Sequence, residues 1–294
     1  MENSRNYLLV AFLGCSIAVM VVANTILGQR ATMALSFIIN QVIGIILATL
    51  VLPFLRPKKR RESIAWYWYF GGVYGFFIIH ANFITVTHIG AAFSMATAVF
   101  GQTIGSLLFD LTGFMGMKKH PITKNKAVTL VISLIGIIIM SLQGGSFSIP
   151  YILIGIGSGA LTMIQMVYNS RFAEKKGILF SARHTVITGL LFALVAYSVM
   201  GFKATVGPIS VIRDIPILLV VTGGILSIVI VSGANYVVSK VPALYYALLL
   251  SSTQILVSVF LDYYFFDLFS ITLLIGALVI LVGMGIGTFM GQRN

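Results

Sequence analysis

Acidic residues and cysteine are scarce in this sequence, and each scarcity excludes a class of protein. Only seven of the 294 residues are Asp or Glu, against nineteen Lys or Arg, and charged residues make up 9% of the chain. Soluble globular domains carry about 25% charged residues, so the chain does not belong to that class. Its single cysteine, Cys15, can form neither an internal disulfide nor a cysteine-rich metal cluster. A disulfide scaffold and a structural zinc site are therefore excluded.

The chain is rich in apolar residues. They make up 59% of the chain, and the mean hydropathy is +1.03. A helix needs about 20 apolar residues to cross a bilayer. Stretches of that kind occur at 8–27, 34–55, 64–86, 90–115, 127–143, 149–169, 182–201, 216–239, 243–266 and 271–290. The sequence predicts an all-α integral membrane protein with ten transmembrane helices.

The basic residues are distributed unevenly between the predicted loops. If the N-terminus is cytoplasmic, only Arg30, Lys203 and Arg213 of the nineteen fall on the outer side, and the run 56–61 is the densest inner cluster. Short loops rich in Lys and Arg stay on the cytoplasmic side, so both termini are predicted to be cytoplasmic. These charges act as topology anchors against anionic headgroups, and no nucleic-acid partner is predicted.

Two segments 152 residues apart share one polar pattern. Gln, Ser and Asp recur at intervals of four residues, which puts them on one helical face, at Gln102, Ser106 and Asp110 and again at Gln254, Ser258 and Asp262. At an offset of 145, other positions match, namely Gly14 with Gly159, Asn24 with Asn169, Ser36 with Ser181 and Gly44 with Gly189. The sequence therefore predicts two repeats, 1–145 and 146–294, of five spans each.

An odd number of spans inverts the second repeat in the membrane. Inverted repeats are a recurring architecture of secondary carriers, in which a site near the middle of the bilayer opens to each side in turn. On this topology Asp110 lies toward the cytoplasmic end of its span and Asp262 toward the outer end of its own.

Polar side chains within the spans are the candidate site residues, because they are unfavourable in lipid and should face the bundle or a wet cavity. The alternative for about half of them is interhelical hydrogen bonding. The predicted substrate contacts are His80, Asn82, Gln102, Asn40, Gln165, Asn169, Asn235 and Gln254.

Three of the titratable groups are candidates for proton coupling: Asp110, Asp262 and His80. His80 lies far from a predicted span end and can carry a proton near neutral pH. For each aspartate, the alternative is that it caps a helix end or pairs with a loop cation. The sequence leaves both roles open for each aspartate, proton coupling and a structural contact.

Ten spans in two inverted halves resemble the drug/metabolite transporter (DMT) superfamily and its EamA-like ten-helix architecture. The segments 71–75, 88–92 and 101–110 are similar to those of the YdcZ-type five-span family, here as a fused pair, although Pro242 stands within the corresponding stretch of the second half. The resemblance implies a secondary carrier, commonly an exporter. Small multidrug resistance members carry an acid in the first span, which this chain lacks, so a neutral or zwitterionic substrate is favoured.

The sequence predicts an inner-membrane secondary active transporter that exports a small polar or amphipathic metabolite or drug by alternating access. Its expected partners are the substrate, the lipid bilayer and protons or another coupling ion, and it acts as a monomer or homodimer. No cofactor, metal or catalytic residue is predicted. A channel or facilitator is the alternative, followed by a membrane enzyme or scaffold.

Overall fold

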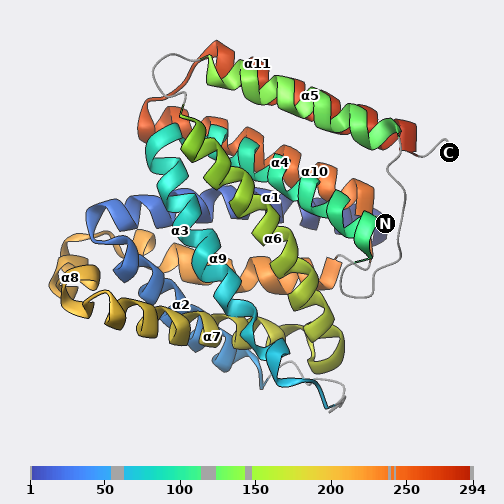
Figure 1. The fold of residues 1–294 in the computed structure, drawn as a ribbon. Helices are drawn as coiled ribbons and strands as arrows, with labels where there is room; N and C mark the ends of the chain where they lie inside the picture. Colours follow the sequence, from blue (N-terminus) through green and yellow to red (C-terminus); the bar gives the residue numbers. More distant parts are fainter. Residues whose placement is uncertain are drawn as a thin grey trace. The chain divides into compact units, whose positions relative to one another are not determined.

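The computed structural model describes residues 2–53, 63–113, 124–142, 148–237, 240–241 and 243–291. Long helices dominate this part of the chain (Figure 1). They are α1 (Glu2–Arg30), α2 (Met33–Val51), α3 (Gly71–Ile89), α4 (Ala91–Thr112), α5 (Lys124–Ser141), α6 (Ile149–Lys176), α7 (Ile178–Val199), α9 (Ile217–Val237), α10 (Ala243–Leu261) and α11 (Ile271–Gly291). Shorter turns are η1 (Trp66–Phe70), α8 (Phe202–Val206), η3 (Ile209–Asp214) and η4 (Asp262–Phe266).

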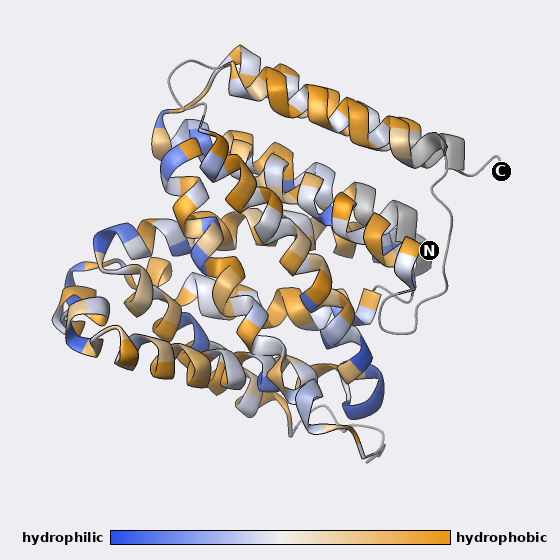
Figure 2. Ribbon diagram, viewed as in Figure 1, coloured by the Kyte–Doolittle hydropathy of each residue, from blue (hydrophilic) through white to orange (hydrophobic). Residues whose placement is uncertain are grey.

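These helices confirm the predicted all-α membrane fold of ten spans in two inverted five-helix repeats. Within the described residues, eight helices are long and apolar enough to cross a membrane, and the apolar parts of α5 and α11 are somewhat shorter. Apolar residues are orange along much of the described part of this helix pair (Figure 2). The long helices occupy the ten stretches expected from hydropathy.

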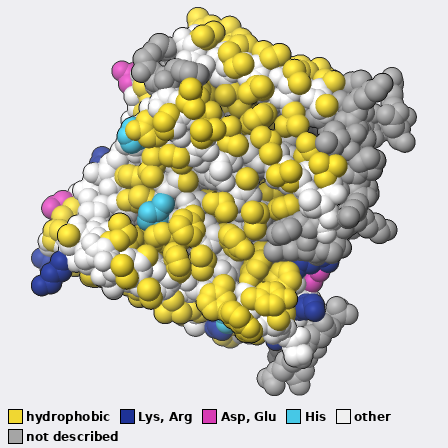
Figure 3. Space-filling model, in the orientation of Figure 1, with side chains coloured by type: hydrophobic (Ala, Val, Ile, Leu, Met, Phe, Trp, Pro, Cys, Tyr) yellow, Lys and Arg dark blue, Asp and Glu magenta, His cyan; other side chains and the backbone are white. Residues whose placement is uncertain are grey.

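Large apolar side chains lie on the surface, as expected of helices that face lipid. Val199 and Leu218 are 85% and 75% exposed. Hydrophobic side chains make up much of the face in Figure 3, and the few charged ones gather toward its edges. Such a surface is unfavourable in water and favourable in a bilayer.

The chain forms two compact units that differ from the sequence repeats. Unit 1 comprises 1–19, 84–164 and 240–294, and unit 2 comprises 20–83 and 165–239. Each unit therefore takes segments from both repeats, and α1 and α6 both pass from unit 1 into unit 2. The repeat boundary at 145/146 stays a prediction.

In unit 1, α5 and α11 form a close pair that runs side by side (Figure 1). Gly136 and Gly276 face each other at its centre, and a Cβ on either would come 2.7 Å from the carbonyl oxygen of the other. Small residues of this kind let helix backbones approach closely in membranes. Gly136 lies in the first predicted repeat and Gly276 in the second, so the two repeats contact each other directly at this helix pair.

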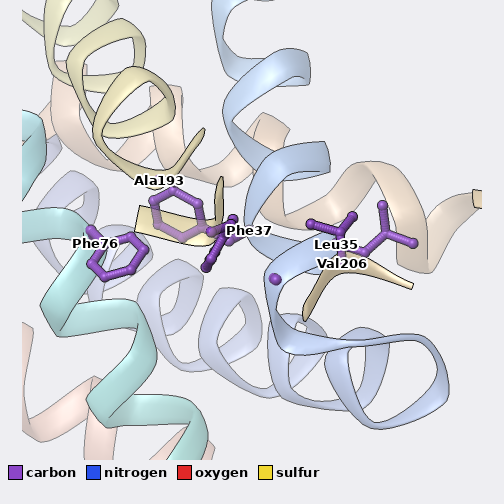
Figure 4. Close-up of a cluster of buried hydrophobic side chains, with 7 residues drawn as sticks. Leu35, Phe37, Phe76, Ala193 and Val206 are labelled. Atoms are coloured by element: carbon purple, nitrogen blue, oxygen red, sulfur yellow. The ribbon is translucent and has the colours of Figure 1, made fainter. Parts of the chain in front are cut away.

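In unit 2, an apolar cluster joins α2, α3 and α7 (Figure 4). Phe37 is fully buried and meets Phe76 edge to face, with ring centroids 5.5 Å apart. Ala193 and Tyr197 of α7 complete this side of the cluster. The cluster fixes the surroundings of α3 near its middle.

Unit 2 also contains one hydrogen-bond set built twice, once by each repeat. In the first, Ser36 Oγ donates to the carbonyl oxygen of Asn24 at 3.1 Å, and Asn40 Nδ2 donates to Asn24 Oδ1 at 2.7 Å. These bonds join α1 to α2. Asn24 and Asn40 are both buried, so the bonds satisfy polar groups that lipid could not.

The second set joins α6 to α7 at positions 145 residues further along. Ser181 Oγ donates to the carbonyl oxygen of Asn169 at 3.1 Å, and Thr185 Oγ1 donates to Asn169 Oδ1 at 3.1 Å. Ser181 corresponds to Ser36 and Thr185 to Asn40. The matched residues of the sequence therefore perform the same packing role in both repeats.

Each set receives a glycine of the other repeat. A Cβ on Gly223 of α9 would lie 2.0 Å from Asn24 Oδ1 and 2.3 Å from Asn40 Oδ1. A Cβ on Gly71 of α3 would lie 2.4 Å from Asn169 Oδ1. The two glycines are 152 residues apart, so the exchange between repeats is reciprocal.

Replacement of Gly223 by alanine is expected to destabilise the protein, because the new methyl group collides with two buried amide oxygens. Overpacking of this kind costs about 1–3 kcal/mol. A lower Tm of the purified protein in detergent measures the loss.

Gly157→Ala is the matched control, because a Cβ there meets nothing within 4 Å and α6 continues through it. We expect its Tm to stay the same or rise. Equal Tm values for the two variants would contradict the packing at Gly223.

Candidate functional site

The predicted site residues are divided between the two units. Unit 2 contains His80, Asn82, Asn40, Gln165, Asn169 and Asn235, and unit 1 contains Gln102, Gln254, Asp110 and Asp262. Burial separates them further, since Asn40, Asn169 and Gln254 are fully buried whereas His80, Asn82, Gln102, Gln165 and Asn235 are half-buried. The half-buried side chains keep a surface that other molecules can reach.

The buried amides of unit 2 are engaged in packing between helices. Asn40 and Asn169 belong to the two repeated hydrogen-bond sets, each of which links neighbouring helices. The Oδ1 atom of Asn40 has no hydrogen-bond partner among the described residues and lies against Gly223. These contacts support interhelical hydrogen bonding, the alternative that the sequence left open for about half of the polar groups.

Gln165 of α6 holds the start of α3. Its Nε2 donates to the carbonyl oxygen of Gly71 at 3.1 Å. One turn further along α6, the hydroxyl of Tyr168 donates to the carbonyl oxygen of Tyr67. From α7, Thr188 Oγ1 accepts a bond from the Gly72 amide at 3.2 Å. The first turn of α3, whose amides have no partner within their own helix, is thereby tied to α6 and α7.

His80 lies in the middle of α3 with both ring nitrogens engaged. Its Nδ1 is 2.7 Å from the carbonyl oxygen of Phe76, and its Nε2 is 2.9 Å from the hydroxyl of Tyr197 on α7. The imidazole packs on the Phe76 ring with centroids 4.0 Å apart and lies 5.6 Å from Phe37. This histidine and its tyrosine form a polar pair at the edge of the aromatic cluster.

Asn82 and Asn235 are the remaining amides of unit 2. Asn82 is half-buried and follows His80 by two residues on α3, so it points to a different side of the helix. Asn235 lies near the end of α9, and its Nδ2 is buried with no hydrogen-bond partner among the described residues. A buried donor without a partner is unfavourable unless something else accepts its hydrogen bond.

The two glutamines of unit 1 differ in their surroundings, although the sequence treats them as mates. Gln254 of α10 is buried, and its Nε2 lies 2.8 Å from the sulfur of Met95. Its Oε1 has no partner in the described part of the chain. Gln102 of α4 is half-buried. The pair therefore contains one packed side chain and one that is partly exposed.

Asp262 is fully buried at the start of η4, directly after α10, and caps the start of α4. Its Oδ1 accepts from the Ala91 amide at 2.6 Å, and its Oδ2 accepts from the Ala92 amide at 2.7 Å. Both amides lie in the first turn of α4, where helix dipoles favour a negative charge. Gly90, with φ of 78°, makes the sharp turn from α3 into α4 and leaves room for the carboxylate.

The segment 88–92 thus acquires a physical role, since its glycine and two alanines form the socket for the aspartate of the other repeat. The side chain of Asp110, the repeat mate of Asp262, lies outside the described residues. In the described part of the chain, no group of three His, Cys, Asp or Glu side chains is arranged to hold a metal ion.

Some residues of these contacts were not expected from the sequence. Tyr197 is 117 residues from His80 in the sequence, and no local sequence pattern predicts their hydrogen bond. Asn24 was signalled only by its match to Asn169. Arg183 stands at the edge of the predicted span 182–201 but lies well inside α7, because that helix begins at Ile178.

Comparison with known proteins agrees with this fold. A family model described as "Putative inner membrane exporter, YdcZ" matches residues 6–139 and again 150–286. A solved crystal structure of a protein shares the fold with a TM-score of 0.61 and 19% identity, over 99% of this chain and 98% of the other. Comparison with curated proteins gives no match.

The family match covers most of the chain and repeats once within it. Apolar helices across the same residues make the protein a multi-pass inner membrane protein of an exporter family. The chain belongs to the YdcZ family of the DMT superfamily and contains two of its five-helix units in tandem.

Proposed function

We propose that the protein is a secondary active transporter that exports a small polar or amphipathic metabolite or drug by alternating access. The observation that carries the proposal is the hydrogen-bond set that each repeat builds with its own helices and closes with a glycine of the other. Two repeats with the same internal contacts can adopt each other's conformation at little cost in energy. An inverted pair of that kind opens a site to each side of the membrane in turn.

The half-buried polar side chains are the better substrate contacts. Asn40, Asn169 and Gln254 are buried in contacts between helices, so a substrate reaches them only if those contacts break. His80, Gln165, Asn82, Asn235 and Gln102 keep partly exposed surfaces. Of these, His80 combines a polar edge with the aromatic surface of Phe76, which suits an amphipathic ligand.

Proton coupling through His80, Asp110 or Asp262 is a separate part of the proposal. For Asp262, the two short bonds to the first turn of α4 support a structural role as a helix cap. His80, whose Nε2 lies 2.9 Å from the Tyr197 hydroxyl, is the better candidate proton carrier of the two.

The proposed orientation places both termini in the cytoplasm, with the first repeat entering from that side. The excess of Lys and Arg in the inner segments supports it. The protein acts as a monomer or a homodimer.

Counterflow in proteoliposomes distinguishes a carrier from a channel. A thermal-shift screen of metabolites on the purified protein first identifies a ligand, since binding raises Tm by mass action. We expect uptake of that labelled ligand to be accelerated by unlabelled ligand inside and to saturate. Unsaturable uptake without acceleration would make the protein a channel or facilitator.

His80→Asn and Tyr197→Phe are expected to weaken transport of that ligand, because the first removes the imidazole and the second removes the hydrogen bond that holds it. Loss of one such bond raises KM by about tenfold. His88→Asn is the matched control, since His88 bonds the carbonyl oxygen of Ile84 in the same way but stacks on Tyr151 and is exposed. Similar KM values for all three variants and the wild type would remove His80 from the site.

Asp262→Asn is expected to lower stability by about 1–3 kcal/mol, because an amide accepts through one oxygen where the carboxylate accepts through two. Asp267→Asn removes the same charge at an exposed position whose left-handed backbone, φ of 53°, suits asparagine, and its Tm should not fall. The response of transport to a pH gradient should survive in both variants. Its loss in Asp262→Asn at unchanged Tm would identify Asp262 as the proton carrier.

A further inference from the structure

We propose that α7 and α9 of unit 2 form a binding site for an anionic group, a carboxylate or a phosphate, with Arg183, Ser232 and Asn235 as its ligands. The three side chains share one property. Each has a buried polar atom, Nε of Arg183, Oγ of Ser232 and Nδ2 of Asn235, with no hydrogen-bond partner among the described residues. All three atoms carry hydrogens that can be donated, and one belongs to a permanent cation.

Arg183 carries a positive charge within a transmembrane helix. It lies five residues after the start of α7, in a helix apolar enough to cross the membrane. In the described part of the chain, no acidic side chain forms an ion pair with it. A cationic side chain at such a place is unfavourable without a partner, which makes it a functional candidate.

The close approach of α2, α7 and α9 sets these residues at one level. A Cβ on Gly44 of α2 would lie 3.3 Å from Val186 of α7, 3.3 Å from Ser227 Oγ and 3.5 Å from Ile228 of α9. Earlier along α2, Gln41 contacts Gly189 of α7, so α7 runs antiparallel to α2. Asn40 contacts Gly223 of α9, so α9 runs parallel to α2.

Arg183 is therefore about one turn before Val186 on α7, and Ser232 is one turn after Ile228 on α9. Both lie at the level of α2 that is one turn beyond Gly44. Their faces agree as well. Arg183 lies between Leu179 and Val186 on α7, and both belong to one apolar cluster with Ile228 of α9. Ser232 follows Ile228 by one helical turn, and Asn235 follows Ser232 by three residues on the same side of α9.

The repeat supplies an independent check on this arrangement. Ser232 is 152 residues beyond His80, Arg183 is 145 beyond Ile38, and Tyr197 is 145 beyond Leu52. We call the surroundings of His80 the first environment and those of Ser232 the second. In the first environment, His80 lies beside the apolar cluster that contains Phe37, and Ile38 packs against that cluster. The Tyr197 hydroxyl forms a hydrogen bond with His80. In the second, Leu52 packs against the cluster of Leu179 and Val186 at the position that corresponds to Tyr197.

The second environment therefore has an arginine where the first has an isoleucine, and a leucine where the first has a tyrosine hydroxyl. The guanidinium donors of Arg183 are added, and the hydroxyl that partners His80 in the first repeat has no counterpart beside Ser232. The Arg183 guanidinium carbon lies 5.7 Å from the centre of the Phe180 ring, which restrains the side chain. A ligand that fits must supply acceptors and negative charge, as a carboxylate or phosphate does.

Binding of an anion does not depend on transport, so its test is made on binding alone. The Tm of the purified protein in detergent is measured against increasing sodium phosphate, and separately sodium succinate, with sodium chloride at equal ionic strength as reference. We expect a saturable rise for the wild type with at least one of the two anions. In Arg183→Gln, the concentration at half-effect should increase by about tenfold or more, because charge-assisted bonds are lost.

Arg171→Gln is the matched control, since it removes the same charge from an exposed arginine of unit 2 that pairs with Glu174 at 3.5 Å. Its anion response should equal that of the wild type. Ser232→Ala is a milder variant that keeps the cation and should weaken the response by a few-fold. If Arg183→Gln is poorly folded, Ser232→Ala tests the site in its place. The Tm of Ser232→Ala in sodium chloride then shows that this variant is folded.

A lipid headgroup carries the same chemistry, and a second arm identifies it. Native mass spectrometry compares the retention of phosphatidylglycerol and phosphatidylcholine by the wild type and Arg183→Gln. A phosphate or succinate response assigns the site to a soluble anion, whereas phosphatidylglycerol retention lost in Arg183→Gln assigns it to a lipid. Identical behaviour of the wild type and Arg183→Gln in both arms would overturn the proposal.

Discussion

The bilayer requires every polar group inside it to find a partner within the protein, and the rest of the structure depends on how the chain meets that requirement. Asn24 and Asn169 meet it in the same way, by accepting bonds from a serine and from the residue four positions later on the next helix. Because the solution is used twice, the two repeats share their internal geometry. Asp262 meets the same requirement by bonding two amides of α4.

Departures from this shared geometry are where the function is to be sought. His80 and Ser232 are repeat mates, yet the first has a hydroxyl partner and the second has a buried oxygen without one among the described residues. The common scaffold allows the repeats to exchange conformations, whereas unequal polar groups give each environment its own ligand preference. A carrier needs both, since symmetry alone confers no selectivity.

Much of the fold was predictable, because hydropathy and the basic loops determine spans, and the Gln, Ser and Asp matches reveal the repeats. The limits of helices were less predictable. α6 extends to Lys176 and α7 begins at Ile178, four residues before the predicted span at 182, so Arg183 lies inside the helix and not at its first turn. Long-range partners such as Tyr197 for His80 depend on the register between helices, which a single sequence does not encode locally. For the same reason, only the structure shows that Asn40 and Asn169 are buried and thereby differ from the half-buried candidates.

The central claim is that the two repeats are inverted equivalents that open in turn to opposite sides. Cysteines introduced separately at His80 and Ser232, in a Cys15→Ser background, test it most directly through labelling of intact cells and inverted vesicles with a membrane-impermeant thiol reagent. The account predicts that the cysteine at position 232 reacts from the cytoplasmic side and the one at position 80 from the outer side. A ligand found by thermal shift should change the two rates in opposite directions. Reaction of both from the same side, with or without ligand, would contradict the account.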